Sequence, residues 1–347
     1  MIHQPGGKTG IRLSGFVLVL VSLTWTACSK LGFLPPSRSI DTGNQRVSEV
    51  AQQLARSLIR INYVATYSIT GFSLSDRMTT QRLRDSLSTD LNASLRFENV
   101  TASGTGILLE ATPTEVIVLT CAHIGNRPDT VLTYYSPSPP GYLQAVGLKV
   151  HEKYYSSELS GIREMELLVE DRLSDLALLG AHRAGNAEYR PAVPFPLLST
   201  ANLKWGEPIF IMGYPLGHLM LTGGRISAPE SDTPYLLLDA LFNPGFSGGL
   251  VFSCDNADRK AYWIGVAKSV AASSQWLLSP PADSLPSSDF STFPYTGTPW
   301  VTRQQQIHYG VTFAIRSETV AAFLSAANPA LREKGYGTLN TAIQQPD

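Results

Sequence analysis

The sequence is poor in charged residues and contains no run of lysine and arginine. Only 16% of its 347 residues are charged, and the formal net charge at pH 7 is −1. A chain of this kind lacks the basic surface that binds nucleic acid by neutralising phosphates. We therefore expect no nucleic-acid partner.

Cysteine is also scarce, with Cys28, Cys121 and Cys254 as its three occurrences. Their spacing matches no metal-binding motif, so the sequence implies neither a metal nor an organic cofactor. We interpret Cys121 and Cys254 as small buried side chains, and a disulfide between them is the alternative.

Apolar and turn-forming residues are abundant: 43% of the chain is hydrophobic, and there are 28 glycines and 23 prolines. This mixture predicts a sizeable core built from many short strands joined by turns, as in antiparallel sandwiches and barrels. The expected strands are 59–69, 104–109, 116–120, 131–135, 143–150, 166–170, 176–179, 208–212, 235–239, 249–253, 262–267 and 309–315.

Helices and connections are predicted at a few other places. Apolar spacing indicates a helix over 47–58, and Ser317 is expected to cap a closing helix over 317–327. The remaining segments are interpreted as a polar surface excursion (73–99, helical near 79–87), a proline-rich linker between two halves (189–199) and an inserted loop (278–299).

The N-terminus is typical of an export signal. Lys8 and Arg12 precede a short apolar core over 13–23, and small residues lead to Cys28. The same end resembles a bacterial lipoprotein signal, although Trp25 departs from the usual aliphatic residue. We expect a signal peptide over 1–27, lipidation of Cys28 and a flexible tether over 28–45, with an uncleaved membrane anchor as the alternative.

A serine among glycines is the most specific feature: Asn243-Pro-Gly-Phe-Ser-Gly-Gly249. Gly245 allows a turn in which its own N–H and that of Ser247 point to one spot, where they can stabilise an oxyanion. Gly248 and Gly249 are expected to leave room for a substrate carbonyl. Without a base, the stretch would be only a glycine-rich turn with an incidental serine.

Two further residues are candidates for the base and for the acid that orients it. His123 closes an apolar run, which places it at a strand end, and Asp175 precedes the apolar run 176–179. Taken singly, His123 fits a structural histidine and Asp175 a turn residue. Asp171 is the rival carboxylate, but its charged neighbours indicate a solvated turn.

The three motifs together resemble the trypsin-like family, in particular its bacterial HtrA/Deg branch. The matching segments, in the family's order, are Thr120-Cys-Ala-His123, Asp175-Leu-Ala-Leu178 and 243–249, supported by Ser103-Gly-Thr-Gly-Ile107 and 206–217. The resemblance covers about 47–327.

The resemblance implies an all-β fold of two antiparallel six-stranded barrels with a short N-terminal and a C-terminal helix. We expect the protease domain over 46–327, its barrels at about 58–188 and 204–316, and a tail over 328–347. The sequence after the closing helix matches no PDZ domain. The long interval between His123 and Asp175 predicts extra structure around 136–162.

The resemblance also implies a serine endopeptidase. His123 is the base, Asp175 orients it, Ser247 attacks, and the N–H groups of Gly245 and Ser247 form the oxyanion hole. Polypeptides are the expected substrates, and relatives are often oligomers.

Specificity and loop residues follow from the same resemblance. Leu241 would lie at the base of the primary pocket and favour small or apolar side chains. Lys268 would lie where a substrate strand pairs with the enzyme. Phe246 replaces the usual asparagine before the nucleophile and is expected to shade the oxyanion site or part of the cleft.

Two other functions remain open. One is a trypsin-like fold that acts as a binding or scaffold module with weak hydrolysis. The other is an esterase of the α/β-hydrolase type, in which Asp283 or Asp289 and His308 would complete the site, although that fold needs a helix directly after Ser247. For the protease, we expect a role in the bacterial cell envelope, in the periplasm or as an outer-membrane lipoprotein, in protein quality control or processing.

Overall fold

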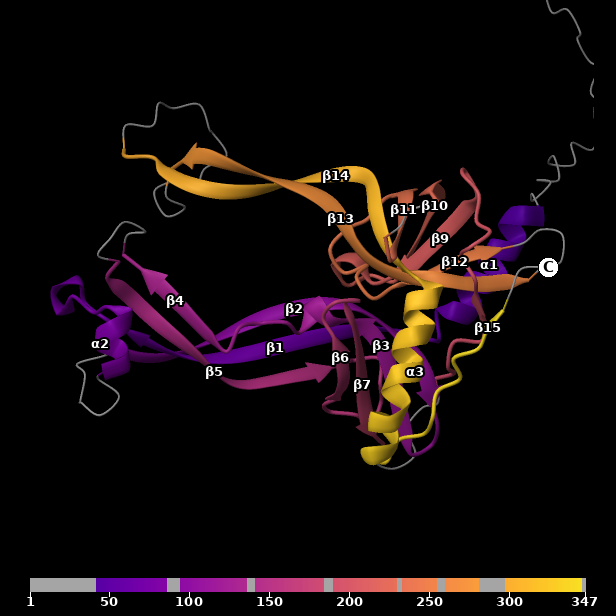
Figure 1. Ribbon diagram of the computed structural model, residues 1–347, viewed down its shortest axis with the longest axis horizontal. Helices are drawn as coiled ribbons and strands as arrows, with labels where there is room; N and C mark the ends of the chain where they lie inside the picture. The colour runs from indigo at the N-terminus through magenta and orange to yellow at the C-terminus, as the bar shows by residue number, and fades with distance from the viewer. Residues whose placement is uncertain are drawn as a thin grey trace, which may run out of the picture. The chain divides into compact units, whose positions relative to one another are not determined.

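The computed structural model describes residues 42–85, 94–135, 141–183, 190–229, 233–254, 260–280 and 297–344. These residues form two mainly antiparallel sheets, with α1 (Thr42–Leu54) before the first and α3 (Ser317–Glu333) after the second (Figure 1). The predicted signal peptide, most of the tether and Cys28 lie outside the described residues, as does most of the loop at 278–299.

The first sheet closes on itself. Within the described residues its order is β4-β5-β1-β2-β3-β7-β6. Tyr154 of β5 also bridges to Met165, just before β6, and the Met165 N–H donates to the Tyr154 carbonyl at 2.8 Å. This bridge makes a ring of six strands, with β4 outside it. The strands are β1 (Leu58–Gly71), β2 (Ser94–Ala111), β3 (Glu115–Cys121), β4 (Thr130–Tyr134), β5 (Leu143–Tyr155), β6 (Glu166–Asp171) and β7 (Leu176–His182).

The second sheet closes in the same way. Among the described residues, β12 pairs with both β9 and β13, which gives the ring β9-β10-β11-β14-β13-β12. Two short parallel strands, β8 and β15, extend it. The strands are β8 (Leu197–Leu198), β9 (Pro208–Gly213), β10 (Met220–Ala228), β11 (Tyr235–Ala240), β12 (Leu250–Cys254), β13 (Ala261–Ser279), β14 (Trp300–Arg316) and β15 (Ile343–Gln344). The predicted fold class, two six-stranded antiparallel barrels, is confirmed.

The core follows from the two-residue period of the strands. In β1, Ile59, Ile61, Tyr63 and Ala65 are fully buried, while the residues between them are partly exposed. One apolar cluster contains residues of both sheets, such as Ile61 from the first and Phe252 from the second. The barrels therefore share a core, and the loops at their junction are held from both sides.

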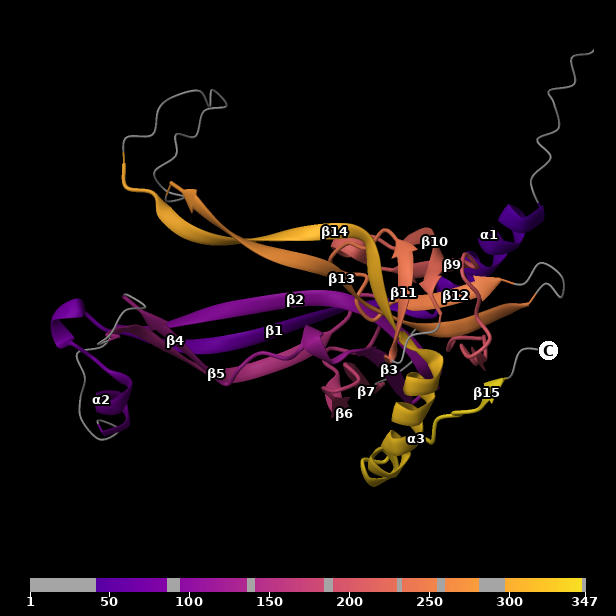
Figure 2. The same cartoon turned by 45° about the horizontal axis from the view of Figure 1, so that its top comes forward.

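Two sets of strands are longer than expected. β2 begins at Ser94, inside the predicted surface excursion, and β13 and β14 pair as far as Ser279 and Trp300. Figures 1 and 2 show β13 and β14 as a two-stranded ribbon that runs out from the second sheet. β10 was not predicted, because Gly223 and Gly224 interrupt its apolar pattern.

The short helices are η1 (Leu74–Asp76), α2 (Thr80–Asp85), η2 (Ala122–Ile124) and η3 (Pro215–Gly217). Three helical elements were expected and lie near their predicted positions: α1, α2 and α3. η2 and η3 are single turns that shape the loops at the barrel junction.

The closing helix corrects two predictions. Arg316, not Ser317, is the N-cap of α3, and Ser317 lies inside the helix, where its hydroxyl donates to the Leu198 carbonyl. The helix also continues past its predicted end, through Pro329 to Glu333. The Asn328 side chain donates to the Leu339 carbonyl and accepts from the Leu339 N–H, which holds the chain after the helix against it.

Glu318 ties the first turn of α3 to the chain around Thr200. Its carboxylate accepts hydrogen bonds from the Thr200 N–H and hydroxyl and from the Ser199 hydroxyl. Burial alone would raise the pKa of Glu318, but these hydrogen bonds prevail and lower it. The carboxylate thus stabilises the fold above its ordinary pKa, and that contribution disappears as pH falls through the lowered value.

Both described cysteines are free thiols, so the alternative of a disulfide between Cys121 and Cys254 is wrong. Cys121 is buried as predicted, whereas Cys254 is only partly buried. No helix in the described part of the chain has the length and apolarity needed to cross a membrane.

Candidate active site

His123 lies in η2, directly after β3, at the junction of the two barrels. Its position is set by Asp175, which lies between β6 and β7. The Ala122 N–H donates to the Asp175 carbonyl at 3.1 Å, and the His123 N–H donates to Asp175 Oδ1 at 2.9 Å. The backbone around the histidine is therefore fixed by the same residue that contacts its ring.

The imidazole and the carboxylate are in direct contact. His123 Nδ1 lies 2.8 Å from Asp175 Oδ2. Because an ionised carboxylate can only accept, Nδ1 carries the hydrogen and Nε2 is left with a lone pair. The His123 side chain is 44% exposed and that of Asp175 only 10%. A buried acid thus orients a ring that faces solvent.

A tight turn presents Asp175. Asp171 accepts hydrogen bonds from the Leu173 N–H at 3.0 Å and from the Ser174 hydroxyl at 2.6 Å. The bond from Ser174 lowers the pKa of Asp171, so this carboxylate serves the turn and not the histidine. Asp175 itself has φ +61°, a left-handed conformation that aspartate tolerates better than most residues.

Ser247 lies in the loop between β11 and β12, which is packed against the first barrel. Gly245 has φ +107° and Gly248 φ +83°. A Cβ at Gly248 would come 2.1 Å from the Thr105 carbonyl oxygen and 3.2 Å from Cys121 N. Gly248 is therefore needed for close approach of the loop to β2 and to the end of β3, and its expected role of leaving room for substrate stays a prediction.

The serine hydroxyl has a partner other than the histidine. Ser247 Oγ donates to the Lys268 carbonyl at 3.0 Å, and the residue is 9% exposed. Among the described residues, no hydrogen bond joins Ser247 Oγ to His123. A rotation of the hydroxyl is needed before the imidazole can take its proton, as is common in structures without substrate.

The N–H groups of Gly245 and Ser247 are both available. Within the described residues, neither donates to a protein acceptor, whereas the neighbouring Phe246, Gly248 and Gly249 N–H groups all do. Two unengaged backbone donors flanking a serine are what an oxyanion hole requires.

Phe246 does not shade this site. Its side chain is only 2% exposed and lies in the core of the second barrel, with its ring 5.9 Å from that of Phe242. The expectation that it covers the oxyanion site or the cleft is wrong, because burial of a large apolar ring outweighs exposure in a loop. Phe246 anchors the loop from behind.

The two predicted specificity residues differ in their surroundings. Leu241 is 60% exposed, so its side chain faces solvent. Lys268 is held: its Nζ lies 2.7 Å from the Tyr235 hydroxyl and 3.9 Å from the centre of the Tyr235 ring. The ammonium group of Lys268 thus contacts the side chain of Tyr235 in β11, while the Lys268 carbonyl faces Ser247.

The residues of the esterase alternative do not assemble. Asp283 and Asp289 lie outside the described residues, and His308 Nε2 is 2.9 Å from the Ser273 hydroxyl, on the ribbon of β13 and β14. The chain after Ser247 enters strand β12, where an α/β-hydrolase would have a helix.

One group of described residues has the proximity of metal ligands: Cys121, His123 and Asp175, whose ligand atoms lie within 4.8 Å of one another. Burial raises the pKa of the Cys121 thiol, and the charge of Asp175 raises it further. The thiol is therefore protonated and donates to the Ala267 carbonyl at 3.5 Å. The Cys121 thiol thus contacts a backbone carbonyl, while His123 and Asp175 contact each other.

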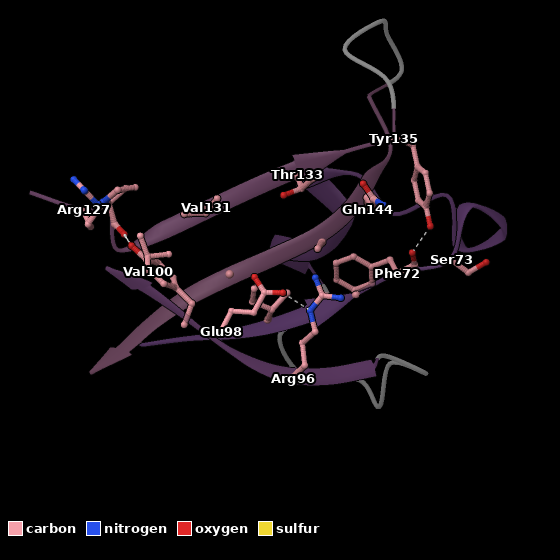
Figure 3. Close-up of a pocket in the computed structure, with 16 residues that line it drawn as sticks. Phe72, Ser73, Arg96, Glu98, Val100, Arg127, Val131, Thr133, Tyr135 and Gln144 are labelled. Carbon is pink, nitrogen blue, oxygen red and sulfur yellow. Dashed lines mark hydrogen bonds and ion pairs between the residues drawn. The ribbon is translucent and has the colours of Figure 1, made fainter. Parts of the chain in front are cut away.

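A cavity of about 680 Å³ lies elsewhere, on strands β1, β2, β4 and β5 (Figure 3). Arg96 and Glu98 point into it and form an ion pair with a 2.8 Å separation, and the Tyr135 hydroxyl donates to the Phe72 carbonyl at one end. None of the predicted site residues lines it.

One residue in contact with the nucleophile loop received no role from the sequence. Thr105 is fully buried in β2, and its N–H donates to the Ser247 carbonyl at 2.7 Å. The signal was a threonine between Gly104 and Gly106 in a strand that also precedes the histidine strand.

Comparisons with known proteins gave one family match and several similar solved structures. Residues 104–257 match the family described as the trypsin-like peptidase domain. The matched segment contains His123, Asp175 and Ser247. One similar solved structure is Deg5, with 18% identity and a TM-score of 0.41; the match covers 86% of this chain and 99% of Deg5. Another is the protease Rv3671c of M. tuberculosis in an inactive form, with 15% identity and a TM-score of 0.38; the match covers 82% of this chain and 94% of that one. A search of curated proteins found no match.

Proposed function

We propose that the chain is a serine peptidase that cleaves polypeptides through His123, Asp175 and Ser247. The match of residues 104–257 to the trypsin-like peptidase domain supports this proposal. The observation that supports these assignments is the contact between His123 Nδ1 and the buried Asp175 carboxylate at 2.8 Å, beside a serine loop with two unengaged N–H groups. Polypeptide substrates follow from the peptidase activity.

The proposed reaction is acyl transfer. The Ser247 hydroxyl turns from the Lys268 carbonyl, His123 Nε2 takes its proton, and Oγ attacks the peptide carbonyl carbon. The resulting oxyanion accepts from the Gly245 and Ser247 N–H groups, while Asp175 stabilises the imidazolium. His123 then protonates the leaving amine, and a water molecule releases the acyl group by the reverse route.

A scaffold module with weak hydrolysis is the second candidate. The observation that favours it is the Ser247 hydroxyl, which is bonded to the Lys268 carbonyl instead of the imidazole. We prefer the peptidase, because the histidine–aspartate contact is already formed and the two N–H groups beside the serine are unengaged.

We propose a preference for small or apolar residues before the cleaved bond, because an apolar Leu241 offers no charge to pair with lysine or arginine. The test is digestion of denatured casein by the full chain, with the cleavage sites read by mass spectrometry. Cleavage after alanine, valine or leucine is expected. Cleavage mainly after lysine or arginine would contradict the preference, and an intact substrate would contradict the peptidase.

We propose that the protein acts in the bacterial cell envelope, held to the membrane by a lipid on Cys28. The basic start, the apolar core and the cysteine support this. In a bacterial host, Cys28→Ala is expected to move the protein from the membrane pellet to the soluble fraction and to prevent labelling by an alkyne fatty acid. Cys254→Ala is the control. A variant that still pellets without label would indicate an uncleaved signal anchor.

A further inference from the structure

The loop that carries Ser247 is held by its carbonyl groups. Four successive carbonyls, those of residues 244–247, all accept hydrogen bonds. The Pro244 carbonyl accepts from the Leu216 N–H at 3.0 Å, and the Phe246 carbonyl accepts from the Gly249 N–H at 2.7 Å. The other two carbonyls are both held by Thr105.

These contacts orient the two oxyanion donors. In a trans peptide the carbonyl and the N–H point in opposite directions. Because the Pro244 carbonyl points to Leu216, the Gly245 N–H points away from it. In the same way the Phe246 carbonyl, held by Gly249, directs the Ser247 N–H to the opposite side. The position of each donor therefore depends on what its peptide's carbonyl contacts.

Thr105 connects to this arrangement at three points. Its N–H donates to the Ser247 carbonyl at 2.7 Å, and its hydroxyl donates to the Gly245 carbonyl at 2.8 Å. The same hydroxyl accepts from the Tyr214 N–H at 2.8 Å. Tyr214 begins the turn that supplies the Leu216 N–H, so the hydroxyl holds both the loop and the turn that orients it.

The first barrel is joined to the same residue. The Thr105 carbonyl accepts from the Thr120 hydroxyl at 2.7 Å, and Thr120 lies in β3, three residues before His123. Thr105 and Thr120 are fully buried, and Tyr214 is 7% exposed, so water cannot replace these bonds. Thr105 thus links three elements: its backbone carbonyl contacts the histidine strand, and its hydroxyl joins the turn at 214–217 to the nucleophile loop.

We propose that Thr105 is a positioning residue for the oxyanion hole. Its hydroxyl holds the Gly245 carbonyl and the turn that begins at Tyr214, and the Leu216 N–H of that turn holds the Pro244 carbonyl and so directs the Gly245 N–H. This inference rests on the proposed peptidase activity. Thr105 touches neither substrate nor reacting atoms, and acts through the backbone of Gly245 and Tyr214. Valine has the shape of threonine without the hydroxyl, so Thr105→Val tests the hydrogen bonds with little change in packing volume.

The test is steady-state hydrolysis of a peptide that wild-type protein cleaves. Thr105→Val is expected to lower kcat by about 10- to 100-fold, with KM within about threefold, because displaced donors weaken transition-state binding more than substrate binding. Thr105→Ser, which keeps the hydroxyl, is expected to recover most of the rate. Thr312→Val is the matched control, since its buried hydroxyl donates to the Ala240 carbonyl at 2.8 Å, outside the nucleophile loop.

A peptide aldehyde separates positioning from general stability. It adds to the serine and leaves an oxyanion in the hole, so its inhibition constant is expected to rise in parallel with the fall in kcat. Binding of the cleaved product peptide is expected to stay unchanged. If Thr105→Val does not fold, Thr105→Cys, a weaker hydrogen-bond former, is expected to give a rate below that of Thr105→Ser.

The outcomes that overturn the proposal are distinct from failure of the function itself. A folded Thr105→Val protein with kcat within threefold of wild type would overturn the positioning role of Thr105. A Thr105→Ser variant as slow as Thr105→Val would also overturn it. If Thr105→Val does not fold, a Thr105→Cys variant as fast as Thr105→Ser would overturn it. Wild-type protein that neither cleaves peptides nor reacts with a fluorophosphonate would overturn the peptidase assignment, and this inference with it.

Discussion

Replacing Ser247 with alanine is expected to abolish reaction with a fluorophosphonate probe and to lower kcat for peptide hydrolysis by roughly 10⁶-fold. The hydroxyl is the attacking group in the proposed reaction, so no covalent intermediate forms without it. The oxyanion donors and the binding surface remain, and they support a residual rate about 10³- to 10⁴-fold above that in water. Fluorescence of the labelled protein on a gel and the peptide assay give the two readouts.

Ser253→Ala is the matched control, because this serine lies in the following strand and its hydroxyl donates only to the Pro208 carbonyl at 3.4 Å. It is expected to label and cleave as wild type does. Labelling of Ser247→Ala at the wild-type rate would place the nucleophile elsewhere. Folded wild-type protein that fails to label would favour the scaffold module.

Asp175→Asn is expected to lower kcat by about 10⁴-fold while the protein stays folded. The carboxylate accepts from His123 Nδ1, which leaves Nε2 free to act as a base. An amide can donate to Nδ1 instead, and the hydrogen then moves to Nε2, where it blocks proton transfer from Ser247. Asparagine also tolerates the left-handed backbone at this position, φ +61°, so the turn is expected to survive.

The measurement is kcat alongside the thermal midpoint of unfolding. Asp171→Asn is the control from the same turn, since Asp171 accepts only from Leu173 and Ser174. It is expected to lower the midpoint slightly and to change kcat by less than about threefold. A folded Asp175→Asn protein that retains more than a tenth of the wild-type rate would show that another group orients the imidazole.

The short apolar strands predicted an antiparallel sandwich or barrel, because their apolar pattern is a local signal, and the resemblance of the three motifs to the trypsin-like family implied two barrels. The sequence predicted His123 directly after one strand and Asp175 directly before another. In the structure the two side chains are in contact. The sequence could not predict how far β2, β13 and β14 extend. Their outer parts are exposed on both faces, so no two-residue apolar period marks them.

Loop residues were the least predictable part of the site. Phe246 follows no strand or helix period, and only the packing around Phe242 shows that it points inward. Thr105 was hidden for a different reason. Its hydrogen bonds reach residues more than a hundred positions away, at Tyr214 and Gly245, and a pattern along the chain cannot report such contacts.

The anchor of the nucleophile loop is an uncharged ring. Phe246 is held by apolar burial, which neither titrates nor is weakened by counterions, and which excluded salts such as sulfate strengthen. The loop therefore keeps its attachment across changes of acidity and ionic strength.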